Sequence, residues 1–346
     1  MQFRGMFLNN STLEGKRMKT LGMAFLLLFL CFGSARAEVR YTVEALDARN
    51  SLAPQYILTE ANGINDNSVV VGKSYCGVDR AYMWSNGITQ DLDKSNPLHP
   101  YYYLTSAYGI NNTNQVVGTA WNQGPNRGFL YNNGSVTDLN TVNSLHSYTL
   151  TDAFGINDRG QVVGKAYNQG VDRAYLWENG TTVDLNYLNN SYPYFILTKA
   201  YDINNSGCIV GNAWASSNPS WNHSFLIRNG QVTDLYSSSL PNVYLTEAYG
   251  INDSDQVVGW ATVNGYNRAY LWNNGNTTIL QDKIPSSTGW ILTKATGINN
   301  NGQIVGTGLL NGYTRAFLLT PVPEPSSLVA LGTLLTPLFA FRRRRK

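Results

Sequence analysis

The stretch GINDRGQVVGKAYNQGVDRAYLWENG, from Gly155 to Gly180, consists of short runs of β-branched and aromatic residues separated by Gly, Asn and Asp. Such runs predict β-strands, and the residues between them predict tight turns. The first ten residues recur five more times, as GINDNSVVVG from Gly63, GINNTNQVVG from Gly109, DINNSGCIVG from Asp202, GINDSDQVVG from Gly250 and GINNNGQIVG from Gly297. The steps between copies are 46, 46, 47, 48 and 47 residues, so the chain is a tandem array of six repeats.

Each repeat contains four segments with the composition of a strand. An LT-x-A segment precedes the ten-residue core, and QVVG, RAYLW and TTVDL-like segments follow it. Four strands in about 40 to 50 residues, repeated four to eight times, are typical of a β-propeller. No segment between residues 38 and 320 has helical periodicity over ten or more residues. We therefore predict an all-β, six-bladed β-propeller of four-stranded blades spanning residues 38–320.

The two ends of the repeat array are complementary. The sixth repeat stops at RAFLLTP and lacks a fourth strand, whereas Tyr41–Asp47 (YTVEALD) precedes the first repeat as an extra strand. Placing Tyr41–Asp47 in the sixth blade, beside Arg315–Leu319, closes the ring and removes two exposed sheet edges. We therefore predict that this N-terminal strand closes the last blade.

Residues 1–37 have the pattern of a secretory signal peptide. Lys16, Arg17 and Lys19 precede the apolar run Leu21–Phe32. Small residues, Ala35 and Ala37, then occupy the cleavage positions. This pattern predicts export of the protein.

Residues 321–346 combine three features. They contain a Pro-Glu-Pro motif (Pro323, Glu324, Pro325), the apolar run Leu328–Phe341 and the basic terminus Arg342–Lys346. This order resembles a PEP-CTERM sorting signal, whose family is cut near the motif by a membrane protease, an exosortase, and is released or re-attached outside the cell. The resemblance implies an exosortase-like protease as partner, transient membrane insertion through a C-terminal helix, and a location in the cell envelope or outside it. An ordinary tail anchor is the alternative.

The repeat resembles the HAF family of extracellular repeats, named for a His-Ala-Phe trio in the third strand. The equivalent trios are Arg80-Ala81-Tyr82, Arg127-Gly128-Phe129, Arg173-Ala174-Tyr175, His223-Ser224-Phe225, Arg268-Ala269-Tyr270 and Arg315-Ala316-Phe317. Only one copy keeps the histidine. The resemblance implies an extracellular location and transfers no catalytic activity.

The charge of the chain argues against nucleic acid as a partner. The full chain has a net charge of +3, but ten of its 25 basic residues and one of its 22 acidic residues lie before residue 38 or after residue 325. The remaining segment carries 15 basic and 21 acidic residues, a net charge of −6. Nucleic-acid binding needs a basic surface, which this segment does not supply.

The sequence contains no motif for catalysis, a cofactor or a metal. His99, His146 and His223 fall in different repeats, and no calcium loop or G-x-S-x-G motif occurs. Cys76 and Cys208 fall in the first and fourth repeats, which a six-bladed ring places too far apart for a disulfide. We therefore predict a non-enzymatic protein without metal or cofactor.

An arginine recurs in five of the six third strands. Propeller sialidases use arginines at the axis to bind anions, which is one interpretation. A residue repeated in nearly every blade more often stabilises the blade, for example through ion pairs with Glu60, Asp152 or Glu247. We favour the stabilising role.

Loop variation predicts a binding face. The loops between strands one and two and between strands three and four are short and uniform, whereas those on the opposite face vary and contain aromatic residues. Tyr and Trp rings beside amides and hydroxyls suit sugars, so we predict polysaccharide binding through Trp121, Tyr167, Trp214, Trp221 and Tyr266. The predicted function is an exported, non-enzymatic binding or structural protein of the cell envelope or extracellular polysaccharide matrix. The alternative is a secreted glycan-cleaving enzyme with an axial active site, which needs two carboxylates about 5 to 9 Å apart.

Overall fold

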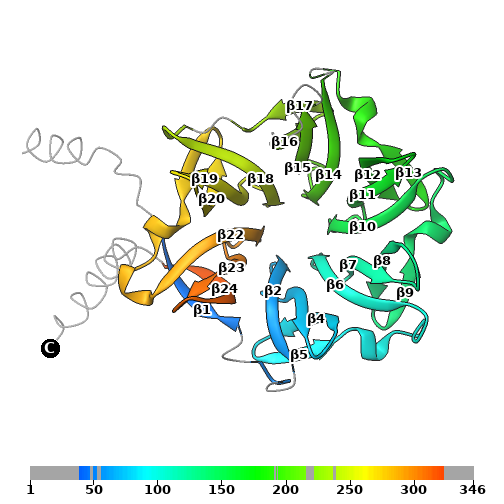
Figure 1. The fold of residues 1–346 in the computed structure, drawn as a ribbon, viewed down its shortest axis with the longest axis horizontal. Coiled ribbons are helices and arrows are strands. Elements are labelled where there is room, and N and C mark those ends of the chain that lie inside the picture. The colour runs from blue at the N-terminus through cyan, green and yellow to red at the C-terminus, as the bar shows by residue number, and fades with distance from the viewer. Residues whose placement is uncertain are drawn as a thin grey trace, which may run out of the picture. The chain divides into compact units, whose positions relative to one another are not determined.

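The computed structural model describes residues 39–46, 50–52, 56–190, 192, 194–215, 222–236 and 239–322. Six four-stranded antiparallel sheets are arranged around a central axis (Figure 1). The predicted six-bladed β-propeller is thus confirmed. The predicted signal peptide and the sorting motif at Pro323, Glu324 and Pro325 lie outside the described residues.

The first strand of each repeat lies nearest the axis and the fourth lies at the periphery (Figure 1). The blades, from the inner strand outward, are β2 (Ile57–Ile64), β3 (Val70–Tyr75), β4 (Asp79–Ser85) and β5 (Ile88–Asp91); β6 (Tyr103–Ile110), β7 (Val116–Trp121), β8 (Asn126–Asn132) and β9 (Ser135–Asp138); β10 (Thr149–Ile156), β11 (Val162–Asn168), β12 (Val171–Glu178) and β13 (Thr181–Asp184); β14 (Phe195–Ile203), β15 (Ile209–Ala215), β16 (Asn222–Arg228) and β17 (Gln231–Asp234); β18 (Val243–Ile251), β19 (Val257–Val263), β20 (Tyr266–Asn273) and β21 (Asn276–Ile279); and β22 (Trp290–Ile298), β23 (Ile304–Leu310), β24 (Tyr313–Val322) and β1 (Arg40–Ala45). We number these blades 1 to 6 in that order.

Short 3-10 turns follow the outer strands of several blades. They are η2 (Asp93–Ser95), η3 (Leu139–Val142), η4 (Leu185–Leu188), η5 (Leu280–Lys283) and η6 (Ser286–Thr288). In η3 and η4 the last Asp of the outer strand caps the turn, since Asp138 accepts from the N–H of Asn140 and Asp184 from that of Asn186. The Asp-Leu ending of these repeats therefore marks the point where the chain leaves one blade for the next.

The ring closes as the sequence predicts. β1 pairs with β24 in antiparallel register, from Arg40 opposite Val322 to Ala45 opposite Phe317. β24 extends two residues beyond residue 320, where we placed the end of the propeller. The closing seam is packed, because Leu58 and Val70 of blade 1 share a buried cluster with Leu318 of blade 6.

The QVVG segment explains how blades pack on each other. Val70 contacts the cluster shared with blade 6, whereas its neighbour Val71 lies in the cluster shared with blade 2. Successive residues of a strand point to opposite faces, and both faces of each sheet are covered by a neighbouring blade. This arrangement requires consecutive apolar residues instead of an alternating pattern.

The glycine of QVVG allows the two inner strands of a blade to approach closely. In blade 3 a Cβ on Gly164 would lie 2.1 Å from the carbonyl oxygen of Asp152. The register of β10 against β11 shifts at this point. The Tyr175 hydroxyl crosses over the glycine and donates to the same carbonyl at 3.1 Å. The glycine and the third-strand aromatic are therefore one packing unit.

A ring of asparagines links each blade to the next. Asn157 donates from Nδ2 to the carbonyl oxygen of Asn204 at 3.1 Å, while its Oδ1 accepts from the N–H groups of Arg159 and Gln161, both at 3.1 Å. The other blade-to-blade bonds run from Asn65 to Asn111, Asn111 to Asn157, Asn204 to Asn252, Asn252 to Asn299 and Asn299 to Asn65. The asparagine of the I-N-[DN] motif thus stabilises its own turn, as expected. The six asparagines together also form a closed ring of hydrogen bonds around the axis.

The proposed ion pairs of the recurring arginine are wrong. Arg127 and Arg173 approach Asp138 and Asp184 of the outer strands at 3.7 and 4.0 Å. The expected carboxylates pair with lysines of the second strand instead, Glu60 with Lys73 at 3.2 Å and Asp152 with Lys165 at 3.1 Å. The register explains the difference, because Glu60 and Lys73 stand directly opposite each other, and so do Asp152 and Lys165. In blades 2 and 3 the arginine thus links the third strand to the fourth, and in blade 1 Arg80 lies 3.4 Å from Asp93 of η2.

Candidate functional site

The described aromatic residues of the predicted binding face lie at the ends of second and third strands. Trp121 ends β7 with 44% of its surface exposed, Tyr167 in β11 is 48% exposed, and Tyr266 begins β20 and is 67% exposed. Trp214 in β15 is half-buried. Trp221 lies outside the described residues. We call the end of the propeller that carries these residues the aromatic face.

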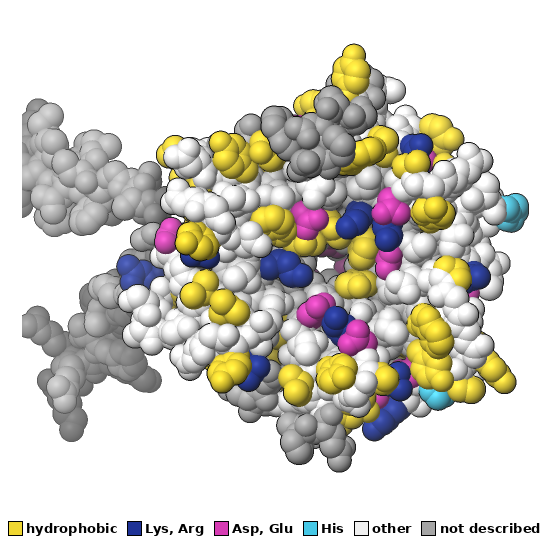
Figure 2. Space-filling model, viewed as in Figure 1, with side chains coloured by type: hydrophobic (Ala, Val, Ile, Leu, Met, Phe, Trp, Pro, Cys, Tyr) yellow, Lys and Arg dark blue, Asp and Glu magenta, His cyan; other side chains and the backbone are white. Residues whose placement is uncertain are grey.

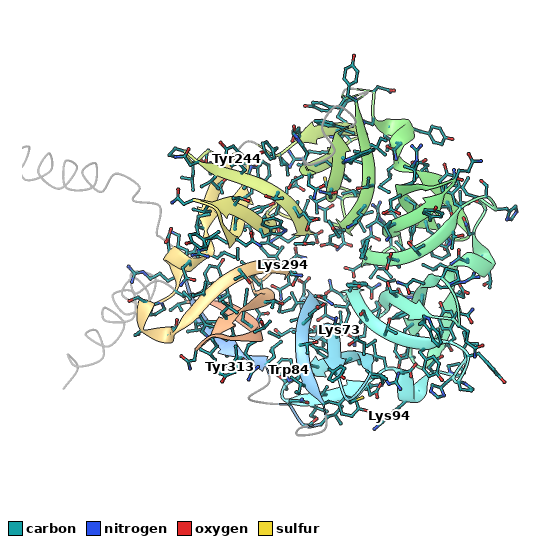
Figure 3. All side chains as sticks on the ribbon, in the orientation of Figure 1. Lys73, Trp84, Lys94, Tyr244, Lys294 and Tyr313 are labelled. Carbon is teal, nitrogen blue, oxygen red and sulfur yellow. The ribbon has the colours of Figure 1, made fainter. Side chains whose placement is uncertain are left out.

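The predicted set of site residues omits other exposed aromatic residues of this face, among them Tyr75 and Tyr313. Tyr75 is 49% exposed at the repeat position of Trp121, and Tyr313 is 68% exposed at the repeat position of Tyr266. Figure 3 places Tyr313 toward the periphery of blade 6. The repeat alignment alone was sufficient to identify both residues.

Guanidinium groups pack on several of these rings. Arg268 lies 5.5 Å from the centroid of the Tyr266 ring, and Arg315 lies 5.7 Å from that of Tyr313. In blade 2 the ring of Trp121 lies 5.8 Å from that of its cross-strand neighbour Tyr103. These contacts orient the exposed rings, so less conformational entropy is lost when a ligand packs on them.

A cavity of about 240 Å³ lies on the axis, among the first strands. One wall is an arc of four aromatic rings from consecutive blades, Tyr108, Phe154, Tyr201 and Tyr249. Neighbouring ring centroids along this arc are 5.1, 5.1 and 4.6 Å apart. The rings therefore form a continuous apolar surface, which we call the aromatic arc.

The opposite wall of the axial cavity is polar. It is formed by Glu60 and Asn62 of blade 1 and by Lys294 and Thr296 of blade 6. The Lys294 amine lies 5.2 Å from the centroid of the Tyr249 ring. Figure 2 shows acidic and basic side chains gathered around the central depression, and Figure 3 places Lys294 and Lys73 near the axis.

Asp202 breaks the symmetry of the cavity. The other five repeats have glycine at this position, and the Cα of Asp202 would lie 2.6 Å from a Cβ on Gly155. Its Oδ1 accepts from the N–H of Ile203 and its Oδ2 from the N–H of Ile251, both at 2.9 Å. Burial raises the pKa of Asp202 to about 7, although these two hydrogen bonds act in the opposite direction.

Glu247 holds two rings of the aromatic arc in place through hydrogen bonds. It accepts hydrogen bonds from the Trp260 indole at 3.0 Å, from the Tyr201 hydroxyl at 3.3 Å and from the Tyr249 hydroxyl. Burial, reinforced by this carboxylate, raises the pKa of both Tyr201 and Tyr249, so their hydroxyls remain donors at neutral pH. The two rings are thereby held in place along the wall.

The other end of the axis is encircled by alternating carboxylates and carboxamides. Asp66, Asp158 and Asp253 alternate there with Asn112, Asn205 and Asn300 around a hollow of about 70 Å³. Oδ2 of Asp158, for example, accepts from Nδ2 of Asn112 and of Asn205, both at 2.9 Å. These carboxylates are therefore hydrogen-bonded within the ring.

The described part of the chain contains no group of three or more His, Cys, Asp or Glu side chains able to hold a metal ion. Within the same part, no helix is long and apolar enough to cross a membrane. The predicted C-terminal helix, Leu328–Phe341, lies outside it. Cys76 and Cys208 are both free thiols.

Fold and site together define a six-bladed β-propeller with an axial cavity and an aromatic face. The sequence profile described as "Protein of unknown function (DUF3466)" matches residues 141–317, and the chain belongs to this family. No curated protein sequence matches it significantly.

Two solved structures resemble the fold at 9% sequence identity. One is a puromycin-hydrolyzing peptidase of Mycobacterium tuberculosis, with a TM-score of 0.37 over 79% of this chain; the chain spans 50% of the length of that peptidase. The other is a protein of unknown function from Bacteroides thetaiotaomicron, with a TM-score of 0.33 over 82% of this chain and 86% of that one.

Proposed function

We propose that this protein is exported and acts, without catalysis, as a polysaccharide-binding module of the cell envelope or extracellular matrix. The observation that carries the proposal is the aromatic face. Large aromatic side chains remain exposed at the same end of successive blades, with Tyr266 at 67%, Tyr167 at 48% and Trp121 at 44%. Exposed aromatic residues that recur in this way are typical of a binding surface.

The geometry of the aromatic face suits a repeating polymer. Tyr75, Trp121, Tyr167 and Trp214 occupy one repeat position in blades 1 to 4, so they present rings at regular intervals around the propeller. A sugar ring can pack its apolar face on such a ring while its hydroxyls contact neighbouring polar groups. Several weak contacts to one chain then add up through multivalency.

The end segments support export of the protein. The signal-peptide pattern with Ala35 and Ala37, and the PEP-CTERM resemblance at Pro323, Glu324 and Pro325, both point to the outside of the cell. In this proposal an exosortase-like protease processes the C-terminus after transient membrane insertion. The intact mass of the protein recovered from its producer tests both cuts, and an uncut N- or C-terminus would contradict this part of the proposal.

The binding proposal is tested by replacing Trp121, Tyr167 and Trp214 with Ala together and measuring binding to the producer's extracellular polysaccharide. Each stacked ring contributes about 0.5 to 1.5 kcal/mol, so the triple variant should bind at least tenfold more weakly. Ile88→Ala is the matched control, because Ile88 is 69% exposed at a uniform loop on the opposite face. Equal binding by the folded triple variant and the control would refute the polysaccharide-binding function.

One observation favours glycan cleavage at the axis as a second candidate function. Two carboxyl groups, Glu60 and Asp202, line the axial cavity, and the raised pKa of Asp202 suits a general acid. Glycan cleavage predicts that the protein releases new reducing ends from the producer's polysaccharide and that Asp202→Asn abolishes this release. No release by the unsubstituted protein would exclude it.

A further inference from the structure

The axial cavity shares no lining residue with the exposed rings of the aromatic face, so it is a distinct site with its own chemistry. Its volume is about 240 Å³, below the roughly 300 to 1,000 Å³ of cavities that hold drug-sized ligands. A ligand that fills it is therefore about the size of a single ring.

Asp202 indicates that the cavity is not merely a gap between blades. Glycine occupies this position in the other five repeats, where the inner strands of adjacent blades approach most closely. A buried carboxyl group is costly, so its presence in one blade of six needs a compensating role. One structural role is visible, because Asp202 bonds to the N–H of Ile251 in the next blade.

Lys294 is a second polar group of the cavity wall. It lines the cavity, its amine lies 5.2 Å from the Tyr249 centroid, and no described carboxylate lies within 4.0 Å of it. Glu60 also lines the cavity and carries hydrogen-bonding capacity beyond its contact with Lys73. The cavity thus offers a donor, Lys294, and two acceptors, Glu60 and Asp202.

These features argue against three kinds of ligand. A cation would meet the amine of Lys294, which already lies on the Tyr249 ring. An anion would meet the carboxyl groups of Glu60 and Asp202. A purely apolar molecule would leave these polar groups desolvated without partners.

We infer that the axial cavity binds one neutral pyranose ring, with an apolar face of the sugar on the aromatic arc and its hydroxyls on Lys294, Glu60 and Asp202. Charged residues surround the mouth of the cavity, among them the ion pair of Glu60 and Lys73 in blade 1, and the sugar enters from that side. A polymer can insert only its end into such a cavity, so this site recognises a chain terminus or a free sugar. The inference does not depend on polysaccharide binding by the aromatic face.

The repeats supply variants that test this inference with little risk to the fold. Asp202→Gly introduces the residue of the other five repeats, Lys294→Ser that of Ser106, and Phe154→Thr that of Thr296. The probes are methyl glycosides of glucose, galactose, mannose and N-acetylglucosamine, with glucuronate and choline as charged probes. Binding to the full-length protein is measured by saturation-transfer NMR and isothermal titration.

At least one methyl glycoside should bind more tightly than both charged probes, and each of the three variants should weaken that binding about tenfold. Ile88→Ala, at the opposite end of the propeller, should leave it unchanged. If no glycoside binds, if a charged probe binds best, or if the folded variants all bind like the unsubstituted protein, the inference is wrong. A loss of stability in Asp202→Gly with unchanged glycoside binding would assign Asp202 a purely structural role and would also overturn the inference.

Discussion

Replacing Asn157 with Ala tests whether the asparagine ring holds the blades together. The side chain is buried and makes four hydrogen bonds. It donates to the Asn204 carbonyl at 3.1 Å and to Gln161 Oε1 at 2.8 Å, and it accepts from the N–H groups of Arg159 and Gln161. Alanine removes all four bonds and leaves buried backbone groups without partners.

The expected cost follows from the number of bonds. A net contribution of about 0.5 to 1.5 kcal/mol for each of the four bonds predicts a loss of about 2 to 6 kcal/mol in the free energy of unfolding. Asn299→Ala should cost a similar amount, because Asn299 makes the equivalent bond across the closing seam, to the Asn65 carbonyl at 2.9 Å. Similar costs at the two positions are expected only if the seam behaves like the other blade contacts.

Urea unfolding followed by tryptophan fluorescence measures these differences. Asn132→Ala is the control, since Asn132 lies exposed at the end of β8, and its change should stay within about 0.5 kcal/mol. If Asn157→Ala matches this control, apolar packing alone holds the blades together and the structural role of the ring is refuted. If only Asn299→Ala matches it, the seam is open in solution.

Four further predictions concern other parts of the molecule. Because the pKa of Asp202 is raised from 3.8 to about 7 on folding, the unfolded chain releases this proton first. The free energy of unfolding should therefore fall by at most about 4 kcal/mol from pH 4 to 7 and then level off. Urea titrations of Asp202→Gly should lack this pH dependence, and a pH profile identical to that of the unsubstituted protein would refute the raised pKa. Gly164→Ala, whose Cβ would meet the Asp152 carbonyl at 2.1 Å, should cost about 3 kcal/mol in urea unfolding. Gly128→Ala, whose Cβ would come no closer than 3.3 Å to its neighbours, should cost much less, and equal effects would contradict the packing argument. Tyr41→Ala in β1, where Tyr41 is 5% exposed, should cost about 3 kcal/mol by the same assay, and an unchanged midpoint would mean that β1 does not support the ring. Deleting Leu328–Lys346 should abolish retention at the membrane in cell fractionation and leave the urea midpoint unchanged; loss of folding would show that the tail belongs to the core.

The architecture could be predicted because each blade is encoded locally. The spacing of the ten-residue core specified the number of blades, and the missing fourth strand of the last repeat specified the partner of Tyr41–Asp47. Neighbouring strands of a meander are also neighbours in the sequence, so their order needs no long-range information. Only the closing strand required an inference across the whole chain.

The axial cavity could not be predicted in the same way. Its aromatic arc combines Tyr108, Phe154, Tyr201 and Tyr249, which are separated by about one repeat each and meet only when the ring closes. One clue was visible, since DINNSGCIVG begins with Asp202 where every other copy begins with glycine. The meaning of that difference depends on where the first strands approach the axis, which the repeat pattern alone does not reveal.

The sequence by itself determined the blade count, the closing strand, the turn positions and the face that carries exposed aromatics, because each depends on local periodicity or on residue type. Tertiary structure alone decided the partners of the charged side chains. Arg127 pairs with Asp138, and Asp152 pairs with Lys165. Both carboxylates are acceptable partners for an arginine by residue type, so the strand register selects between them. It also decided that Asn157 and Asp202 each bond to the next blade, because these two bonds join residues 47 and 49 positions apart. Contacts of this kind depend on the distance between adjacent blades in the closed ring, and the sequence of a single repeat does not specify that distance.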